Sequence, residues 1–278
     1  MEERLDKYLA SETGLTRSEV KKKIRDGRVS VEGIFKLKPE TKIRPGESRV
    51  FLDGAMIEKT GPVYLMMNKP AGILSSTRDR QRTVLDLLPD EDFPRKGEIF
   101  PAGRLDKDTV GLLLLTDDGQ LAHELLSPRL HVEKSYFVIL DGKIPEDLRS
   151  RFQEGIDIGE EKPSRPADLF SIERGGTLSP KMENGLIARA KRVLTESDLS
   201  MIGEGTSGAL VVLTEGKYHQ IKRMFGRFGL SVLFLKRLSM GALFLDRDLP
   251  TGSFRRLREE ELLSLRRRDL SEREMGDA

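Results

Sequence analysis

The sequence predicts an α+β protein with two domains, a small α/β module over residues 1–58 and a larger domain over residues 62–278. Its 278 residues are enough for about two domains of ordinary size. With 37% hydrophobic and 34% charged residues, the composition is typical of a globular protein with a substantial core. Short apolar runs alternate with turns and a few helices, without a regular strand–helix repeat, which favours a mixed, mainly antiparallel sheet in the larger domain.

Composition and spacing exclude several classes of protein. The chain has no cysteine, which excludes disulfides, thiolate zinc sites and cysteine nucleophiles. Its three histidines, His123, His131 and His219, lack the spacing of a metal site, so we expect neither a metal nor a cofactor. No apolar run approaches the roughly 18 residues of a membrane span. The charged N-terminus is unlike a signal peptide, so we expect a cytoplasmic protein.

Basic residues are concentrated in two segments, although the net charge is only +2. Residues 15–28 contain six Lys or Arg against two acidic residues, and residues 216–237 contain six Lys or Arg and no acidic residue. Two separated basic segments in a nearly neutral chain indicate an extended polyanion that is contacted at two places.

Two helices and two strands are expected in the small module. A short helix covers residues 4–10, and Thr16 with Glu19 forms the capping-box pattern that starts a second helix. Strands are expected over residues 29–31 and 49–52, each followed by a turn.

The second helix carries a basic face. Val20 and Ile24 lie one turn apart and face inward, which leaves Lys21, Lys22 and Arg25 in solvent. A charged helix face is more often merely solvated than functional. Here the cations are of one sign and lie between two turns, so an RNA contact is an equal alternative.

Three sequence blocks of the module resemble the S4 RNA-binding domain, namely RLDKYL at residues 4–9, TRSEV at 16–20 and DGRVSVEG at 26–33. In that family the basic helix and the turn that follows it lie on structured RNA. The resemblance therefore implies that RNA is contacted by the basic residues Arg4, Arg17, Lys21, Lys22, Arg25 and Arg28.

Short strands separated by turns are expected in the larger domain, after a linker over residues 55–62. Residues 63–67 form a buried strand that ends in a turn over 68–72, and residues 111–116 form another that is closed by a tight turn over 117–119. Further strands are expected over residues 136–140, 210–213 and 232–235.

A turn-rich stretch over residues 103–111 places carboxylates among cations directly before a buried strand. A neighbouring cation lowers the pKa of a carboxyl and keeps it ionised. Asp106 and Asp108 are equally good candidates for a catalytic carboxylate on this evidence. A structural role of Asp106 in the turn, with Thr109 as its partner, is the ordinary alternative.

Four ordered blocks resemble the RsuA-type bacterial rRNA pseudouridine synthases, which also carry an N-terminal S4 domain. They are NKPAG at 68–72, GRLDKDTVGLLLLT at 103–116, EKSY at 133–136 and EGKYHQIKRM at 215–224. The resemblance implies site-specific isomerisation of uridine to pseudouridine in small-subunit (16S) rRNA. The alternatives are a synthase acting on 23S rRNA or tRNA, and a non-catalytic RNA-binding factor of ribosome assembly.

The resemblance assigns roles by position. Asp106 matches the catalytic aspartate, and Arg104 matches the arginine that helps to displace the target base. Tyr136 matches the aromatic residue on which uracil stacks, and Lys222 matches the cation that pairs with the aspartate. Asp108 falls at a variable position and receives no role. Residues implied to contact the base or the RNA are also Ile221, His219 and Arg223.

The resemblance also implies the partners. Isomerisation neither gains nor loses an atom, so no cofactor is needed, and the partner is rRNA or a ribosomal assembly intermediate bound by a monomer. The spacing between residues 163 and 215 is longer than in compact members of the family. We expect the extra residues within 172–208, as a surface insertion or an additional RNA contact, with a helix over 185–195.

Overall fold

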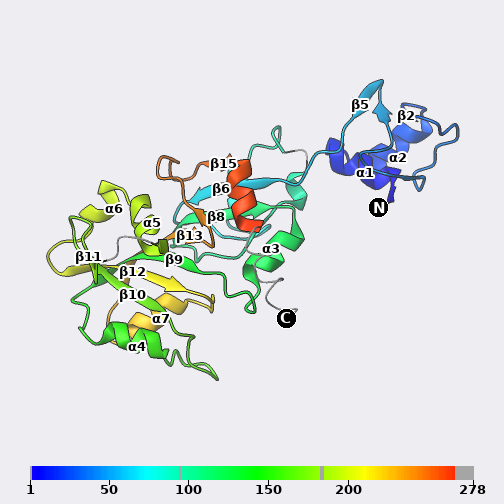
Figure 1. Ribbon diagram of the computed structural model, residues 1–278. Helices are drawn as coiled ribbons and strands as arrows, with labels where there is room; N and C mark the ends of the chain where they lie inside the picture. Colours follow the sequence, from blue (N-terminus) through cyan, green and yellow to red (C-terminus); the bar gives the residue numbers. More distant parts are fainter. Residues whose placement is uncertain (1, 94, 182–184, 267–278) are drawn as a thin grey trace. The chain divides into compact units, whose positions relative to one another are not determined.

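The computed structural model describes residues 2–93, 95–181 and 185–266, which form two compact units (Figure 1). The first unit comprises the chain up to Pro62 together with Leu88–Ile99, and the second comprises Val63–Leu87 and the chain from Phe100 onward. None of the helices within the described ranges is long and apolar enough to cross a membrane.

Residues 88–99 belong to the first unit although the sequence places them in the larger domain. Arg95 forms an ion pair of 3.4 Å with Glu12, and the two side chains are only 13% and 4% exposed. The division into residues 1–58 and 62–278 stays a prediction. The structure groups residues 88–99 with the first unit as well.

Two helices and two small sheets build the first unit. The helices are α1 (Leu5–Thr13) and α2 (Arg17–Arg25), and α2 begins with the predicted capping box. Thr16 Oγ1 accepts a hydrogen bond of 3.2 Å from the Glu19 amide, and the Thr16 amide donates one of 2.8 Å to Glu19 Oε2. One sheet pairs β1 (Glu3–Arg4) with β3 (Lys42–Ile43), and the other has the order β2 (Val29–Val31), β4 (Val50–Leu52), β5 (Ala55–Ile57).

A ten-stranded sheet forms the centre of the second unit, in the order β11-β10-β12-β9-β13-β8-β6-β15, with β7 beside β8 and β14 beside β13. Every pairing is antiparallel except that of β8 with β13, so the predicted mixed, mainly antiparallel sheet is confirmed. The strands are β6 (Tyr64–Lys69), β7 (Phe100–Pro101), β8 (Val110–Thr116), β9 (Lys134–Asp141), β10 (Asp168–Ile172), β11 (Leu178–Ser179), β12 (Thr206–Leu213), β13 (Val232–Met240), β14 (Leu243–Phe244) and β15 (Phe254–Arg256).

Helices lie on both faces of this sheet (Figure 1). They are α3 (Gly119–Leu126), α4 (Leu148–Glu154), α5 (Gly185–Val193), α6 (Glu196–Ser200) and α7 (Gln220–Gly226), with short 3-10 helices at Val84–Leu87 and, in the first unit, Lys96–Glu98. Successive residues of a strand point to opposite faces. Phe137 of β9 therefore packs in the core that includes Ile187 of α5, whereas Tyr136 faces the side of Ile221 of α7.

The described residues of the segment 172–208 build strands and helices of the second unit, so its interpretation as a surface insertion is wrong. Helix α5 covers most of the predicted 185–195 range, and its apolar residues recur on one face. Ile187, Ala190 and Val193 are at most 5% exposed and belong to the main core of the sheet. An additional RNA contact of this segment stays a prediction.

Two turns predicted from the sequence differ from the structure: the turn over residues 68–72 begins two residues later, and the tight turn over residues 117–119 is wrong. Asn68 and Lys69 continue β6 and pair with β8, because the turn-forming Pro70 and Gly72 come only after them. Asp118 caps α3 instead of closing a tight turn, since its Oδ1 accepts a hydrogen bond of 3.0 Å from the Leu121 amide. Both corrections lengthen regular structure at the expense of a loop.

Candidate active site

The loop that carries Asp106 is held between β7 and β8. Gly111, the second residue of β8, has φ +97°, and a Cβ atom there would lie 2.4 Å from the carbonyl oxygen of Arg237. Only glycine permits this approach of β8 to its parallel neighbour β13. The end of the loop is thereby fixed against the centre of the sheet.

The buried side chain of Lys69 anchors the same loop. Lys69 is 0% exposed, and its Nζ donates hydrogen bonds to the carbonyl oxygens of Asp106 (3.2 Å), Lys107 (3.3 Å) and Thr109 (2.9 Å). A fourth bond of 3.0 Å goes to the carbonyl of Pro70. The backbone on both sides of Asp106 is therefore set by one ammonium group.

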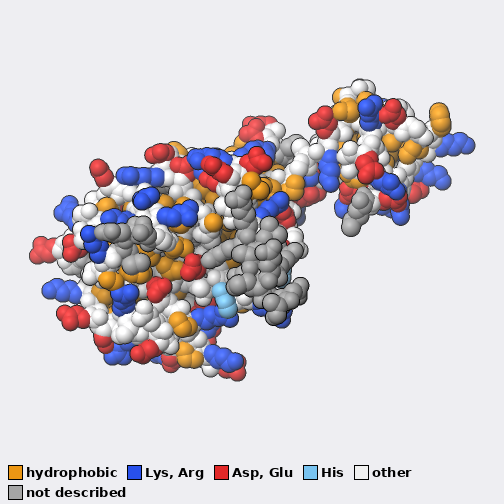
Figure 2. Space-filling view, in the orientation of Figure 1, with side chains coloured by type: hydrophobic (Ala, Val, Ile, Leu, Met, Phe, Trp, Pro, Cys, Tyr) orange, Lys and Arg blue, Asp and Glu red, His pale blue; other side chains and the backbone are white. Residues whose placement is uncertain are grey.

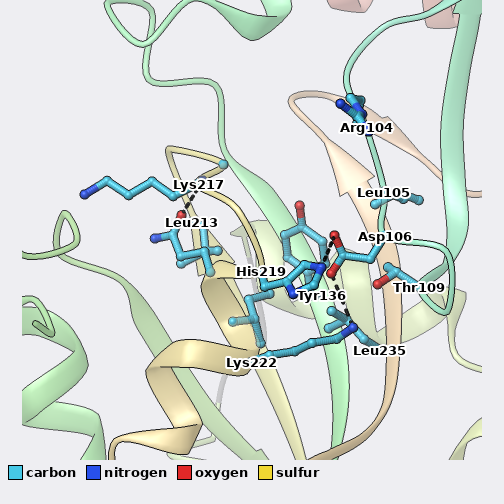
Figure 3. A pocket seen from close by; sticks show the side chains of 13 residues that line it. Arg104, Leu105, Asp106, Thr109, Tyr136, Leu213, Lys217, His219, Lys222 and Leu235 are labelled. Carbon is cyan, nitrogen blue, oxygen red and sulfur yellow. Dashed lines mark hydrogen bonds and ion pairs between the residues drawn. The ribbon is translucent and has the colours of Figure 1, made fainter. Parts of the chain in front are cut away.

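Two groups of the α7 region face the Asp106 carboxylate (Figure 3). Lys222 Nζ lies 3.3 Å from Asp106 Oδ2, and His219 Nε2 lies 3.6 Å from Asp106 Oδ1. The side chain of Asp106 is 26% exposed, so it is reachable by a ligand while still contacting a cation.

Asp108 also belongs to this cluster, although the family resemblance assigned it no role. Lys222 Nζ lies 2.6 and 2.8 Å from its two carboxylate oxygens, closer than to Asp106. Burial alone would raise the pKa of Asp108, but its hydrogen bond and charge interaction with Lys222 lower it. Burial likewise opposes the charge of Lys222, but the two carboxylates raise its pKa. Lys222 therefore stays protonated between two carboxylates.

An apolar wall completes the pocket opposite this charged cluster. Tyr136 of β9 is 8% exposed, and its ring lies beside the Asp106 carboxylate in Figure 3. Leu213, Ile221 and Leu235 line the pocket with it. The site offers one aromatic surface and one carboxylate to the same ligand.

Arg104 lies at the rim, and in Figure 3 its side chain points away from Asp106. It is exposed, and it makes no hydrogen bond or ion pair with any residue that the structure describes. The guanidinium is free to move toward an RNA ligand.

The turn before α7 is braced by two residues that sequence reasoning missed. Gln220 is buried, its Nε2 donates a hydrogen bond of 2.6 Å to Glu215 Oε1, and its Oε1 accepts one of 3.0 Å from the Lys217 amide. Glu215 and Gln220 both lie in the 215–224 block, but its sequence does not show which residues support the turn and which contact a ligand.

The basic residues predicted to contact RNA fall into two groups. Arg4 is bound to Asp6 by two hydrogen bonds of 2.9 Å, and Arg28 donates a hydrogen bond of 2.7 Å to Asp53. Arg223 donates one of 2.7 Å to Glu160. Exposed and without a hydrogen bond or ion pair to the described residues are Arg17, Lys21, Lys22 and Arg25.

A half-buried carboxylate, a paired cation and an aromatic wall in one open pocket are suited to a nucleotide base and its sugar. Residues 63–226 match the family model described as RNA pseudouridylate synthase, and residues 3–48 match that of the S4 domain. The chain belongs to the RNA pseudouridylate synthase family, and it is an enzyme that isomerises uridine in RNA to pseudouridine. The predicted family and class of enzyme are confirmed.

Similar proteins span nearly the whole chain. The uncharacterized RNA pseudouridine synthase YtzG of Bacillus subtilis is 40% identical, over 93% of this chain and 96% of its own length. The ribosomal small subunit pseudouridine synthase A of Escherichia coli K12 is 35% identical, over 94% of this chain and 99% of its own length. A crystal structure of a pseudouridylate synthase matches with a TM-score of 0.58 at 33% identity, over 94% of this chain and 99% of that one.

Replacing Lys69 by Met tests whether its ammonium positions the loop that carries Asp106. The substitution removes one donor from each of four carbonyl oxygens, of which those of Asp106 and Lys107 keep a backbone amide donor, so we expect the free energy of unfolding to fall by about 3 kcal/mol. Urea denaturation measures this change, and Lys7→Met is the control because Lys7 is exposed, with a fall below about 0.5 kcal/mol. Equal effects of the two substitutions would contradict the anchoring role.

The same lysine predicts opposite pH trends for stability and turnover. Burial lowers the pKa of Lys69 to about 8, from 10.5 in the unfolded chain. The unfolded chain therefore binds more protons between these values, and the contribution of Lys69 to stability rises with pH in that window. Turnover falls in the same window because a neutral amine donates more weakly to the loop. If the rate of pseudouridine formation by Lys69→Met falls across this pH window as much as that of the wild type, the assignment to Lys69 is wrong.

Proposed function

We propose that this chain converts a specific uridine of small-subunit rRNA to pseudouridine, with Asp106 as the catalytic residue. The observation that carries the catalytic assignment is the Asp106 carboxylate, 3.3 Å from Lys222 and beside the Tyr136 ring. The choice of RNA is supported by the 35% identity to the Escherichia coli enzyme named for the small ribosomal subunit, over 99% of that protein's length.

The reaction breaks the bond between N1 of uracil and C1′ of the ribose and rejoins C1′ to C5. The proton lost from C5 is matched by one gained at N1, so no atom is gained or lost. An ionised carboxylate beside C1′ can attack it, take the 2′ proton, or stabilise positive charge on the ring. Lys222 keeps a positive charge 3.3 Å from Asp106 in each of these routes.

The target uridine reaches this carboxylate only after it leaves the RNA stack, because C1′ and C5 are shielded within a helix. Tyr136 then offers its face to the extruded uracil, and such stacking contributes about 1–3 kcal/mol. Ile221 closes the pocket beneath the base. The free side chain of Arg104 takes the place that the base has left.

The S4 domain supplies affinity and orientation for the rRNA. Acidic and basic side chains are interspersed over the face that Figure 2 displays, so binding depends on local clusters of cations. One such cluster lies on α2 and consists of Lys21, Lys22 and Arg25. These side chains form no ion pair with the residues that the structure describes. The protein acts as a cytoplasmic monomer, on rRNA or on a ribosomal assembly intermediate.

Reversing the charges of Lys21, Lys22 and Arg25 together is expected to weaken rRNA binding and flatten its salt dependence. Each lost phosphate contact reduces the log–log slope by roughly one unit. The control keeps the charges as Lys21→Arg, Lys22→Arg and Arg25→Lys and should keep the slope. An unchanged slope in the charge-reversed variant would mean that this helix face is only solvated.

Mapping pseudouridines in cells with and without the gene tests the proposed function. We expect one uridine of small-subunit rRNA to lose its modification when the gene is absent. A lost site in large-subunit rRNA or tRNA would contradict the proposed target. An unchanged map would contradict rRNA modification and favour a factor of ribosome assembly.

A further inference from the structure

We propose that the ring of Tyr218 is a stacking platform for a second unpaired base, the neighbour of the target uridine in the RNA chain. The inference rests on the proposed function, because it adds a subsite to the same pocket. Tyr218 is 75% exposed, and its ring is stacked on that of His219 with centroids 3.8 Å apart and planes 18° from parallel. One ring face is covered by His219 and the other is open.

The stacked rings of Tyr218 and His219 lie next to the Asp106 carboxylate. His219 Nε2 lies 3.6 Å from the Asp106 carboxylate, and the Tyr218 ring is stacked on the His219 ring. His219 has φ +48°, a left-handed conformation that is uncommon outside glycine and that histidine, asparagine and aspartate adopt more often than other residues. His219 lies at the turn that joins the two rings to α7. The surrounding structure holds the turn in this conformation.

The loop that carries Tyr218 is held by its neighbours. Arg223 donates a hydrogen bond of 3.2 Å to the carbonyl oxygen of Tyr218 and one of 2.7 Å to Glu160. Lys217 lies 3.4 Å from the same Glu160 and donates a hydrogen bond of 3.2 Å to the carbonyl of Lys162. An exposed aromatic ring on a fixed backbone loses little conformational freedom when a base stacks on it.

Extrusion of the target provides the reason for such a platform. A nucleotide that leaves the stack removes a stacking contact from each of its two neighbours. Aromatic side chains replace these contacts for unpaired bases with little dependence on sequence. Lys217, next to Tyr218 in the chain, lines the same pocket and offers a cation to the phosphates that link the two nucleotides. Tyr136 would hold the target base and Tyr218 its neighbour.

The test uses the purified full-length protein and the rRNA fragment that contains the mapped uridine. Tyr218→Ala should lower kcat/KM by about 5- to 150-fold, the range that base–aromatic stacking provides. Tyr218→Phe keeps the ring and should stay within about twofold of the wild type. Removing the base on one side of the target uridine should impair the wild type as strongly and have no further effect on Tyr218→Ala.

Three results would overturn the inference. They are an unchanged kcat/KM for Tyr218→Ala, an equal loss for Tyr218→Phe and Tyr218→Ala, and fully additive effects of Tyr218→Ala and base removal at both flanking positions. The abasic RNA is tested on the wild-type protein as well as on Tyr218→Ala, and its effect on the wild type does not depend on the folding of a variant. Absence of pseudouridine with the wild type and the intact fragment would instead contradict the proposed function.

Discussion

Asp106→Asn is expected to abolish pseudouridine formation while leaving rRNA affinity within about twofold of the wild type. Asparagine keeps the size and shape of the side chain but lacks the negative charge that the reaction needs. Lys222 should stay in place because it also contacts both oxygens of Asp108, at 2.6 and 2.8 Å. We expect the single-turnover rate to fall by at least about 10⁴-fold, as in other enzymes that lose their reacting group.

The measurement combines single-turnover formation of pseudouridine with equilibrium binding of the same rRNA fragment. Asp108→Asn is the matched control, since it removes one negative charge from the same loop and leaves Asp106 intact. Its rate should stay within about tenfold of the wild type. A rate for Asp106→Asn that equals that of Asp108→Asn would rule out Asp106 as the catalytic residue.

Lys222→Met is expected to produce the second largest loss of activity. The variant leaves two carboxylates side by side without the ammonium that separates them. Without Lys222 the pKa of Asp108 rises, because the hydrogen bond and the charge that lower it are gone. We expect turnover to fall by about 100-fold, because repulsion between the two carboxylates displaces Asp106 from the position that Lys222 holds.

A double variant separates this electrostatic effect from a loss of packing. Lys222→Met combined with Asp108→Asn removes the repulsion between the two carboxylates, so it should be faster than Lys222→Met alone at neutral pH. The pH-rate profiles of the single and double variants give the comparison. If both lose the same activity at every pH, Lys222 acts by filling space and the charge argument is wrong.

Local signals in the sequence predict the elements that form from neighbouring residues. The Thr16–Glu19 capping box is confirmed because both hydrogen bonds join residues within one helical turn. The strand expected over residues 111–116 is confirmed, and its run of four leucines is buried in the sheet. The position of Asp106 beside Lys222 follows from the resemblance of two blocks that lie far apart in the chain, since spacing alone did not separate Asp106 from Asp108.

Contacts between distant segments are what the sequence does not reveal. Asp108 takes the closer contact with Lys222, which lies 114 residues further along. Lys69 belongs to a block that reads as a turn by its proline and glycine, yet its side chain enters the sheet and holds the loop around Asp106. Residues 88–99 return to the first unit through the pair of Arg95 with Glu12. In each case the partner is set by tertiary packing, which no local pattern encodes.

The central claim is that Asp106 acts on the ribose of an extruded uridine whose base lies on Tyr136. A crystal structure of Asp106→Asn bound to the rRNA fragment with the mapped uridine tests it most directly. We expect the uracil on the Tyr136 ring, and C1′ about 3–3.5 Å from the side-chain oxygen of residue 106. A target uridine that remains stacked within the RNA, or that lies outside the pocket of Asp106 and Lys222, would contradict the account.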